Sequence, residues 1–563
     1  MTSDSDVKTL RNLMDRSLEQ YRDLPAIAFA GEPSLTYGEL AEQVEGLARL
    51  LLQQHVRPGE RVALLGDNSP NWVIAYLATI YFGAVVVPIL PGFPDADIRH
   101  IIRNAEAVAI FVTAKLAPKL EDLERDSLHT IIDLEDFAIL ESGSGIRERA
   151  KQLLHKKEPQ PRETIPAPAP SDLAAIIYTS GTTGHSKGVM LTHENITFDV
   201  VQSIEKFPIS SSDRFLSILP LSHTFEATGG MLCPLAVGVN IHYLNGLPTP
   251  EKLLSAMRTV QPTAVLMVPL VIDKIYRKRI LPQLAGNALF RRLLRVPFTR
   301  RLLHKIAGRK LMRSLGGKLR FFMFGGASLN NDVEQFLRDA AISYSTGYGL
   351  TETSPIVSIN PFGCVKTGSC GQAIPGVDLK IADPDPETGV GEILVRGANV
   401  MQGYFSDPEA TAAVLGRDGW FRTGDLGYLD QQEYLYIKGR CKNVIVGPSG
   451  ENIYPEIIEG LLQKNSYVQE AVVYQEGGRL AAKAYLDYDV LDQEFQFDRI
   501  GEAEGEKLTQ KILDQVRAEI NAQLPAHSGL SVIYRYPQPF EKTPTNKVKR
   551  YLYTAVQENA SQP

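Results

Sequence analysis

Residues Tyr178 to Gly188, YTSGTTGHSKG, combine glycines, serines and threonines with one lysine directly after an apolar segment. Glycines let the backbone approach an anion, hydroxyl and amide groups donate hydrogen bonds, and a lysine neutralises charge. A Walker A loop is disfavoured, because Gly184 lies three residues before Lys187 and Gly188 follows it. A flexible polar surface loop is the alternative. The segment predicts a polyphosphate site formed by Thr179, Ser180, Gly181, Thr182, Thr183, Gly184 and Lys187.

Five more motifs follow in order along the chain. They are FGGASL (324–329), YGLTE (348–352), GWFRTGDLG (419–427), GRCKNVIVGPSGENIYPEIIE (439–459) and EKTPTNKVKR (541–550). With the phosphate segment, this series closely resembles the signatures of the adenylate-forming (AMP-binding) superfamily. That superfamily includes acyl-CoA synthetases, firefly-type luciferases and the adenylation domains of peptide synthetases. The resemblance covers essentially the whole chain and implies that a carboxylate attacks the α-phosphate of ATP.

The resemblance assigns the metal to Glu352 of YGLTE. Magnesium prefers hard oxygen ligands and needs only one or two protein carboxylates, so a single Glu suits Mg²⁺. A solvated surface acid is the alternative. ATP would be contacted by Gly325, Gly326, Ala327, Gly347, Tyr348, Gly349 and Thr351. The pair Gly347 and Gly349 lacks the third glycine of a dinucleotide fingerprint, and the glycines of FGGASL are equally compatible with a tight turn.

Asp425 and Arg440 complete the predicted nucleotide site. In the family pattern Asp425 pairs with the ribose hydroxyls, since a carboxylate can accept from two vicinal hydroxyls. Arg440, fifteen residues later, would reach the ribose or a phosphate, and Lys442 stands where the family has a hinge between domains. A turn in which Asp425 bonds its own backbone is the alternative.

Lys547 is the predicted catalytic lysine of the first half-reaction. In the family a lysine near the C-terminus bridges the carboxylate and the α-phosphate, where a flexible ammonium group can follow the developing charge. The alternative is a solvated basic face, because Lys542, Lys549 and Arg550 lie close by in the sequence. Asn546 stands where the family commonly has glycine, and Ser186 where proline is common.

A second half-reaction needs a thiol. Gly447 and Gly450, in VGPSGEN, would let a pantetheine arm pass once the small domain has rotated. Both CoA and a carrier protein present this arm, so both acceptors stay open.

Two segments bear on which carboxylic acid is the substrate. LPLSHTFE (219–226) and MVPLVIDKIY (267–276) resemble their counterparts in long-chain fatty acyl-CoA synthetases. His223 would lie near the carboxylate, although a packed core histidine is the alternative. Gly229 and Gly230 would leave room for an apolar acyl tunnel that Val268 helps to form. No buried carboxylate that could meet an amino-acid ammonium is identifiable at a matching position of the sequence. A medium- to long-chain fatty acid is therefore the first prediction and an aryl acid the second.

Two functions outside this class are the remaining alternatives. A non-catalytic nucleotide-binding protein would lose Glu352 or Lys547, and both are present. A luciferase-like oxygenase would share every motif through Lys547.

The chain that must position these residues has 563 residues, 44% of them hydrophobic and 22% charged. Alternating helical patterns and short apolar runs between residues 35 and 115 predict an α/β fold with mainly parallel strands. The net charge of −6 gives no indication of a nucleic-acid partner, because the chain is not basic overall. Four cysteines without metal or disulfide spacing, and no signal peptide at the start of the sequence, predict a cytoplasmic protein.

The predicted organisation is a large multi-layered N-terminal α/β domain (1–437), a hinge (438–442) and a small mobile α+β domain (443–563) that carries Lys547. In the small domain we expect a helix over 455–462, strands over 468–474 and 480–486, an acidic loop over 487–506, and an amphipathic helix from Leu508 to Leu524. The apolar run 73–90 reaches the length of a membrane span. Gly83 and Pro88 break it, so a helix followed by a buried strand is favoured.

Charge is segregated in residues 274–320, which hold fifteen Lys or Arg residues and no Asp or Glu. The rest of the chain has 44 basic and 65 acidic residues. Phe298, Leu302 and Ile306 recur here at helical spacing among basic residues. This pattern predicts either a basic amphipathic helix at an anionic membrane surface, or a helix packed on the core by this apolar stripe with a solvated or CoA-binding basic face.

Overall fold

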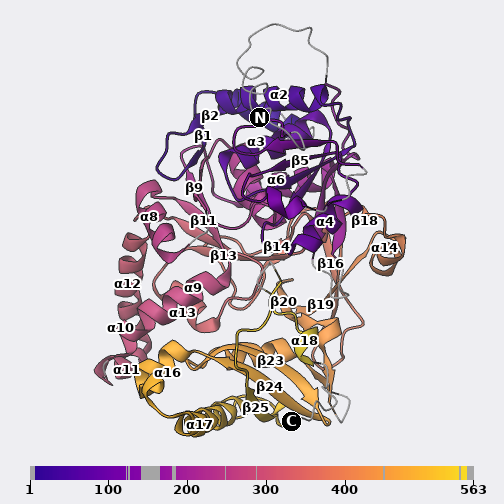
Figure 1. The fold of residues 1–563 in the computed structure, drawn as a ribbon. Coiled ribbons are helices and arrows are strands. Elements are labelled where there is room, and N and C mark those ends of the chain that lie inside the picture. The colour runs from indigo at the N-terminus through magenta and orange to yellow at the C-terminus, as the bar shows by residue number, and fades with distance from the viewer. Residues whose placement is uncertain are drawn as a thin grey trace. The chain divides into compact units, whose positions relative to one another are not determined.

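The computed structural model describes residues 7–121, 123, 127–140, 165–179, 186–246, 249–286, 288–447, 451–543 and 547–554. The chain forms two compact units. The first comprises Met1–Leu379, Leu394–Arg422 and Gln431–Leu435, and the second comprises Lys380–Ile393, Thr423–Asp430 and Tyr436–Pro563. Figure 1 shows the elements of both.

A nine-stranded, mostly parallel sheet lies in the first unit. Its order is β15 (Gln372–Ala373), β14 (Ile356–Ile359), β13 (Tyr344–Gly349), β12 (Phe321–Phe324), β11 (Ala264–Met267), β9 (Arg214–Ser217), β10 (Asn240–Tyr243), β1 (Pro25–Phe29) and β2 (Leu35–Thr36). From β13 through β1 each neighbouring pair is parallel. Its central strands are apolar on both faces, as parallel strands covered by helices require.

A seven-stranded sheet forms the second layer of this unit. Its order is β18 (Gly403–Tyr404), β8 (Lys187–Thr192), β7 (Leu173–Thr179), β4 (Val85–Ile89), β3 (Arg61–Leu65), β5 (Ala109–Val112) and β6 (Thr130–Asp133). The strands from β7 to β6 pair in parallel, whereas β8 is antiparallel to both of its neighbours. A four-stranded sheet has the order β16 (Val377–Ala382), β17 (Gly391–Gly397), β19 (Phe421–Leu429) and β20 (Leu435–Arg440).

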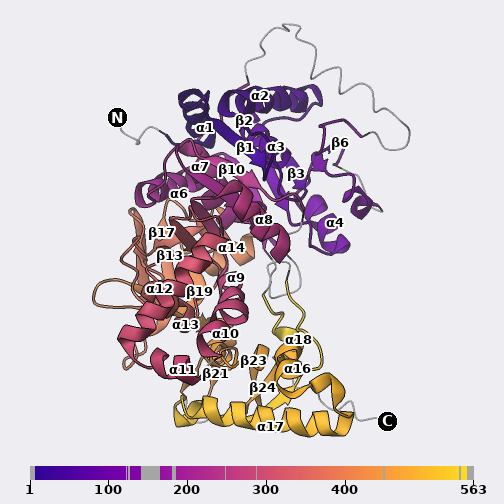
Figure 2. The ribbon, with the colours of Figure 1, turned by 90° about the vertical axis from the view of Figure 1, so that its left-hand side faces the viewer.

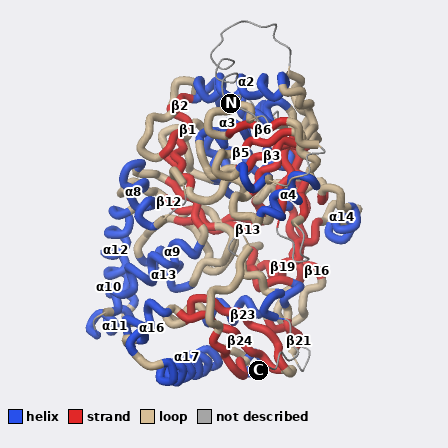
Figure 3. Tube along the Cα trace, in the orientation of Figure 1, coloured by secondary structure: helices blue, strands red, loops and turns tan. Residues whose placement is uncertain are grey.

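Helices flank these sheets (Figures 1 and 3). They are α1 (Leu10–Gln20), α2 (Tyr37–Gln53), α3 (Pro70–Phe82), α4 (Asp95–Asn104), α6 (His193–Lys206), α7 (Cys233–Ala236), α8 (Pro250–Val260), α9 (Pro269–Ile275), α10 (Leu281–Ala285), α11 (Ala288–Leu294), α12 (Pro297–Ser314), α13 (Asn331–Asp339) and α14 (Pro408–Val414). Two π-helical turns, Glu226–Leu232 and Tyr276–Ile280, interrupt the series. Mixed α/β architecture, as the alternating patterns predict, is confirmed.

The apolar run 73–90 is a helix followed by a strand. Ser69 caps α3 by accepting from the Trp72 amide, Pro70 occupies the first turn, and Gly83 ends the helix at φ +83°. Strand β4 then pairs with β3 and β7. Among the described residues no helix has the length and apolarity needed to cross a bilayer.

The second unit contains a three-stranded sheet, β23 (Val468–Glu476), β24 (Arg479–Leu486) and β25 (Leu530–Arg535), and the pair β21 (Ile445–Val446) and β22 (Asn452–Ile453). Its helices are α15 (Pro455–Leu462), α16 (Tyr488–Phe495), α17 (Glu502–Asn521) and α18 (Tyr551–Thr554). Ile512, Leu513, Val516 and Ile520 of α17 pack on the core of this unit. Figure 2 shows α17 along its whole length.

The acidic loop predicted over 487–506 is wrong. Asp487 caps α16 by accepting from the Val490 amide, and Leu491 is buried in the core of the unit. Helix α17 begins at Glu502, and Glu502 and Glu504 lie in its first turn, where acids favour the helix dipole. Four of the eight acids in this segment, Asp487, Asp489, Glu502 and Glu504, are N-cap or first-turn residues.

Candidate functional site

Four of the predicted site segments leave one sheet at the same edge. β9, β11, β12 and β13 are parallel, and Met267 is in register with Phe324, which is in register with Thr346. The segment with His223 follows β9, Val268 follows β11, the FGGASL turn follows β12, and YGLTE spans the end of β13. Ligands of open α/β sheets bind beyond the carboxyl ends of the strands. The topology therefore brings these four segments, which carry predicted acid and nucleotide residues, to one edge.

The FGGASL turn depends on its two glycines for different reasons. A Cβ on Gly325 would lie 2.8 Å from the Phe225 ring, so this position admits no side chain without a shift of the ring. Gly326 has φ +81°, a conformation that L side chains rarely adopt. A Cβ at Gly326 would lie 3.9 Å from Val268, so the predicted acyl residue adjoins the turn. Gly326 and Ala327 are exposed.

Gly347 and Gly349 are needed by the sheet itself. A Cβ on Gly347 would lie 2.9 Å from the Ser358 carbonyl oxygen, and one on Gly349 would lie 1.6 Å from the Pro355 carbonyl oxygen. The backbone of β14 therefore occupies the space that side chains would fill. Tyr348 and Thr351 are half-buried beside them. The motif holds a close strand pair at the site edge.

Glu352 is joined to the second sheet through Tyr404. The Tyr404 hydroxyl donates to Glu352 Oε1 at 3.0 Å, and Lys187 Nζ lies 5.0 Å from the centroid of the Tyr404 ring. Tyr404 belongs to edge strand β18, where it pairs with Val189 of β8. A carboxylate suited to a metal and a lysine suited to phosphate are thus oriented by one aromatic side chain.

The turn that carries Glu352 is fixed by buried hydrogen bonds. Asp199 Oδ2 accepts from the Ile356 amide at 2.6 Å, and Asn399 Nδ2 donates to the Ile356 carbonyl at 2.7 Å. Ser354 Oγ donates to the Asn399 carbonyl at 2.9 Å, while Thr228 Oγ1 donates to the Ser354 carbonyl at 3.1 Å. Burial raises the pKa of Asp199 well above its ordinary value.

Most of the predicted phosphate loop lies outside the described residues, namely Ser180, Gly181, Thr182, Thr183 and Gly184. Its two ends are described. Thr179 ends β7 and is in register with Lys187, the first residue of β8. The lysine is therefore held on a strand at the mouth of the loop.

His223 lies just before a π-helical turn that includes Gly229 and Gly230. The Ala227 amide donates to the His223 carbonyl at 2.9 Å. A Cβ on Gly229 would lie 2.9 Å from Leu266 Cδ2, and one on Gly230 would lie 2.6 Å from the Glu226 carboxyl. In this structure Leu266 and Glu226 fill the space beside the two glycines.

Glu226 is a buried acid that sequence analysis did not single out. Its side chain is 1% exposed, and burial raises its pKa to about 8, against a smaller opposing effect of a hydrogen bond with Ser217. The carboxyl group is therefore mostly protonated at neutral pH. It lies on the π-helical turn between the predicted acid and acyl residues.

In the second unit Asp425 and Arg440 meet. Arg440 Nε lies 3.0 Å from Asp425 Oδ1, and the Asp425 carboxylate is 8% exposed. The Thr423 hydroxyl accepts from the Asp425 amide at 3.0 Å, so β19 and β20 hold the two predicted ribose residues together. Lys442 follows in a short 3₁₀ turn, Cys441–Asn443, and is exposed.

Lys547 emerges from a tight turn. The Thr543 amide donates to the Lys547 carbonyl at 2.7 Å, and the Lys547 amide donates to Thr543 Oγ1 at 3.2 Å. The turn is part of a strand pairing in which Lys542 is bridged to Val548. Lys547 is exposed, and residues 544–546, including Asn546, lie outside the described part of the chain.

The other basic residues near Lys547 have acidic partners. Lys542 pairs with Glu470, Lys549 with Glu541, and Arg550 with Glu459. Glu470 also accepts from the Phe540 amide, and Glu459 accepts from the Val473 amide. These three residues anchor the turn to its own unit and are not a merely solvated basic face.

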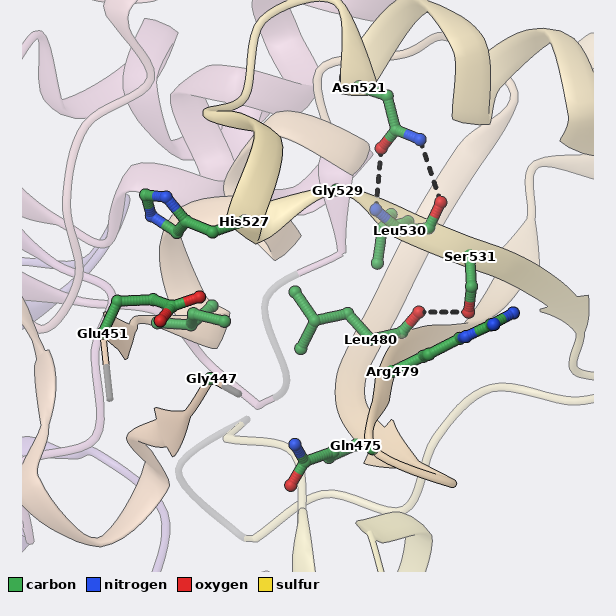
Figure 4. A pocket seen from close by; sticks show the side chains of 12 residues that line it. Gly447, Glu451, Gln475, Arg479, Leu480, Asn521, His527, Gly529, Leu530 and Ser531 are labelled. Atoms are coloured by element: carbon green, nitrogen blue, oxygen red, sulfur yellow. Dashed lines mark hydrogen bonds between the residues drawn. The ribbon is translucent and has the colours of Figure 1, made fainter. Parts of the chain in front are cut away.

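A pocket of about 510 Å³ lies in the second unit (Figure 4). Its walls include Gly447, Glu451, Gln475, Arg479, Asn521, His527 and Ser531. Asn521 fixes one wall by hydrogen bonds to the amide and carbonyl of Leu530, at 2.8 and 2.9 Å. Gly447, one of the two predicted CoA residues, lines the pocket, whereas Gly450 lies outside the described residues.

The chain is similar in sequence to known enzymes. Residues 14–405 match the AMP-binding enzyme family. A long-chain-fatty-acid–CoA ligase of Mycobacterium tuberculosis is 31% identical over 464 residues, covering 78% of this chain and 75% of the relative. The peroxisomal long chain acyl-CoA synthetase 7 of Arabidopsis thaliana is 29% identical, covering 92% of this chain and 79% of the relative. The chain therefore belongs to the AMP-binding enzyme family, and its enzyme class is that of the AMP-forming acid–thiol ligases.

Solved structures share the fold along nearly the whole chain. An anthranilate CoA ligase in complex with anthranoyl-AMP superposes with a TM-score of 0.77 at 19% identity, covering 97% of this chain and 96% of the other. A benzoate CoA ligase from Burkholderia xenovorans LB400 gives 0.76 at 20% identity, covering 97% and 100%. The predicted α/β fold of the superfamily is confirmed.

Proposed function

We propose that this enzyme joins a medium- to long-chain fatty acid to CoA at the expense of ATP. In the first half-reaction a carboxylate oxygen attacks the α-phosphorus, pyrophosphate leaves, and an acyl-adenylate forms. In the second, the CoA thiol gives up its proton and its sulfur attacks the acyl carbon. The bond between that carbon and the AMP oxygen breaks, and AMP leaves with the electron pair. The observation that carries the proposal is the meeting of the predicted acid and nucleotide segments at one edge of a parallel sheet.

Glu352 is the proposed magnesium ligand. Its carboxylate supplies hard oxygens, is half-buried, and has one oxygen held by the Tyr404 hydroxyl, so the donor set fits Mg²⁺. The ion when bound would neutralise phosphate charge. Lys187 would add a positive charge at the phosphates, and Tyr404 orients both groups.

Lys547 is the proposed catalytic lysine of adenylation. An ammonium group on a flexible stem can follow charge as it develops on the α-phosphoryl oxygens. The paired residues Lys542 and Arg550 support the turn without competing for that role. Asp425 and Arg440, which lie 3.0 Å apart, would bind the ribose, since a carboxylate and a guanidinium can both hydrogen-bond to hydroxyl groups.

CoA is the proposed thiol substrate. Gly447 lines a pocket that also contains Arg479 and His527, side chains that can pair with phosphate groups of CoA. A carrier-protein pantetheine brings fewer phosphates to such a pocket. Lys442 is the proposed hinge between a large domain (1–437) and a small domain (443–563).

The proposed acid rests on the long-chain ligases among the relatives and on the Gly229 and Gly230 segment. A long chain entering beside Gly229 requires Leu266 to rotate, because Leu266 fills that space here. This filled space favours an aryl acid as the second candidate, since a short flat acid would need less room. Because long-chain acids partition into lipid, we place the enzyme in the cytoplasm in peripheral contact with membrane.

A substrate panel tests the proposal. Pyrophosphate release and thioester formation would be measured for saturated acids from acetate to palmitate and for benzoate, with CoA, with a pantetheinylated carrier protein, and with no thiol. We expect the highest kcat/KM for acids of eight or more carbons with CoA. A maximum of kcat/KM at benzoate or acetate would overturn the assignment. So would thioester formation with the carrier protein but not with CoA.

A further inference from the structure

Exposed apolar side chains gather on one part of the first unit. Of the thirteen large apolar side chains exposed in the described part of the chain, seven lie between residues 270 and 306. They are Leu270, Leu281, Phe290, Val296, Phe298, Leu302 and Ile306. Six of the seven belong to or adjoin the consecutive helices α10, α11 and α12, which contact one another (Figures 1 and 2).

Helix α12 turns its apolar stripe outward. Phe298 is 79% exposed, Leu302 54% and Ile306 56%, and their spacing of four residues places them on one face. A stripe of this size on a helix of a folded unit is ordinarily its packing face. The prediction that the helix packs on the core by this stripe is wrong.

The inner face of α12 is attached by other means. Asp339 of α13 is 3% exposed and pairs with Arg300 at 2.8 Å and His304 at 3.1 Å. A Cβ on Gly308 would lie 2.6 Å from the Ala340 Cβ, so the chain following α13 approaches α12 closely at that glycine. The helix is therefore held firmly while its apolar stripe stays in solvent.

Basic side chains flank the stripe. Lys305 and Arg309 share the outward face, and Arg295 precedes the helix; all three are exposed. Within the described part of the chain these three residues form no salt bridge, unlike Arg300. Residues 274–320 contain no acid, so this segment itself carries only basic charge.

We propose that α11 and α12, with Phe298, Leu302 and Ile306 at the centre, bind an anionic lipid bilayer. The apolar side chains would enter the interface, and the flanking cations would meet the lipid phosphates, as in amphipathic helices that lie on membranes. A protein partner would need an acidic rim around an apolar groove. A bilayer of acidic lipids offers apolar chains and anionic phosphate groups over a surface of any size. The surface does not depend on which acid the enzyme activates.

Vesicle sedimentation tests the surface without any substrate. The parent chain should sediment with phosphatidylcholine vesicles that contain phosphatidylglycerol, not with phosphatidylcholine alone, and added salt should weaken binding. The double variant Lys305→Glu with Arg309→Glu should bind about tenfold more weakly or worse. The matched control, Lys507→Glu with Lys511→Glu on the exposed face of α17, has the same net charge and should bind as the parent does.

The apolar part is tested by Phe298→Ser, Leu302→Ser and Ile306→Ser together, with Phe495→Ser as control. These side chains are already exposed, so the variant should keep parental activity on a water-soluble acid while losing vesicle binding. The proposal is overturned if the parent ignores anionic vesicles or if the Lys305 and Arg309 variant binds like its control. It is also overturned if sedimentation velocity without lipid shows a dimer that the serine variant abolishes, because the stripe would then be a contact between two copies.

Discussion

Tyr404 shows how one side chain can orient two charged groups of opposite sign. Its hydroxyl donates to Glu352 and its ring lies beside Lys187, so it connects the proposed metal ligand to the proposed phosphate-binding lysine. Nothing in the sequence marks it beyond a tyrosine after a glycine, which is why it was missed. The contacts appear only when β18 pairs with β8.

Removal of the Tyr404 hydroxyl should weaken metal-dependent adenylation. A hydrogen bond to a charged group contributes about 1.5–3 kcal/mol, so Tyr404→Phe should raise the half-saturating Mg²⁺ concentration about tenfold. Tyr404→Leu, which also removes the ring beside Lys187, should raise the KM for ATP as well. Pyrophosphate release measured against Mg²⁺ and ATP separates the two effects, with the exposed Tyr551→Phe as control. Parental Mg²⁺ dependence in Tyr404→Phe would contradict the orienting role.

Lys547→Ala should separate the two half-reactions. Its charge is needed at the α-phosphate, so acyl-adenylate formation should fall at least about a hundredfold, whereas CoA transfer from preformed acyl-adenylate should stay within about threefold of the parent. Single-turnover measurement of each step gives the two rates, with exposed Lys507→Ala as control. Equal loss in both steps would point to a structural role for the lysine.

At the scale of elements, the π-helical turn Glu226–Leu232 stores a titratable group in the core. The pKa of Glu226 is about 8, against an ordinary value of 4.5. The folded protein therefore binds a proton that the unfolded chain has released, and the resulting stability is full below pH 4.5 and is lost as the pH rises to 8.

Glu226→Gln removes this titration. Relative to the variant, the parent should lose up to about 5 kcal/mol of unfolding free energy between pH 4.5 and pH 8, at about 1.36 kcal/mol per pH unit. Urea unfolding of both proteins at several pH values measures the difference, and any constant offset from the amide drops out. Parallel pH profiles for the two proteins would show that Glu226 is ionised in the folded state.

The sequence predicted helices and strands correctly where the apolar periodicity and the capping residues indicate the same boundaries. Helix α15 spans Pro455–Leu462 as predicted, and the run 73–90 folded as a helix and a strand because Ser69 and Gly83 end α3 on both sides. The loop predicted over 487–506 failed because acids that cap helices resemble acids that solvate loops. The sequence left open whether the apolar stripe of α12 faces the core or the solvent. Periodicity identifies an apolar face of a helix but not what that face contacts.

For the site residues too, those within local motifs could be predicted, and those brought together from distant segments could not. The resemblance to the superfamily's motifs pointed to Asp425 and Arg440, and the fold places them 3.0 Å apart. The buried network of Asp199, Asn399, Ser354 and Thr228 that fixes the Glu352 turn is assembled from four distant segments, so no local pattern announces it. The acyl tunnel expected at Gly229 and Gly230 stays a prediction, because Leu266 and Glu226 now occupy that space.

At the scale of the whole molecule, the first unit contains the proposed nucleotide edge, the proposed acid segment and an outward-facing amphipathic helix. The second unit contains the Asp425–Arg440 pair proposed to bind the ribose, the exposed Lys547 and the pocket at Gly447. Activation of a sparingly soluble acid near a lipid surface would use all of these features. The proposed reaction begins with attack of a carboxylate on the α-phosphate of ATP.

The most direct test follows the oxygen of the acid. A long-chain acid labelled with ¹⁸O in both carboxylate positions would be incubated with the enzyme, ATP, Mg²⁺ and CoA, and the products analysed by mass spectrometry. Because one carboxylate oxygen becomes bonded to the α-phosphorus and leaves with AMP, we predict one ¹⁸O atom in AMP, one in the acyl-CoA and none in pyrophosphate. Label in inorganic phosphate, or AMP without label, would contradict the account.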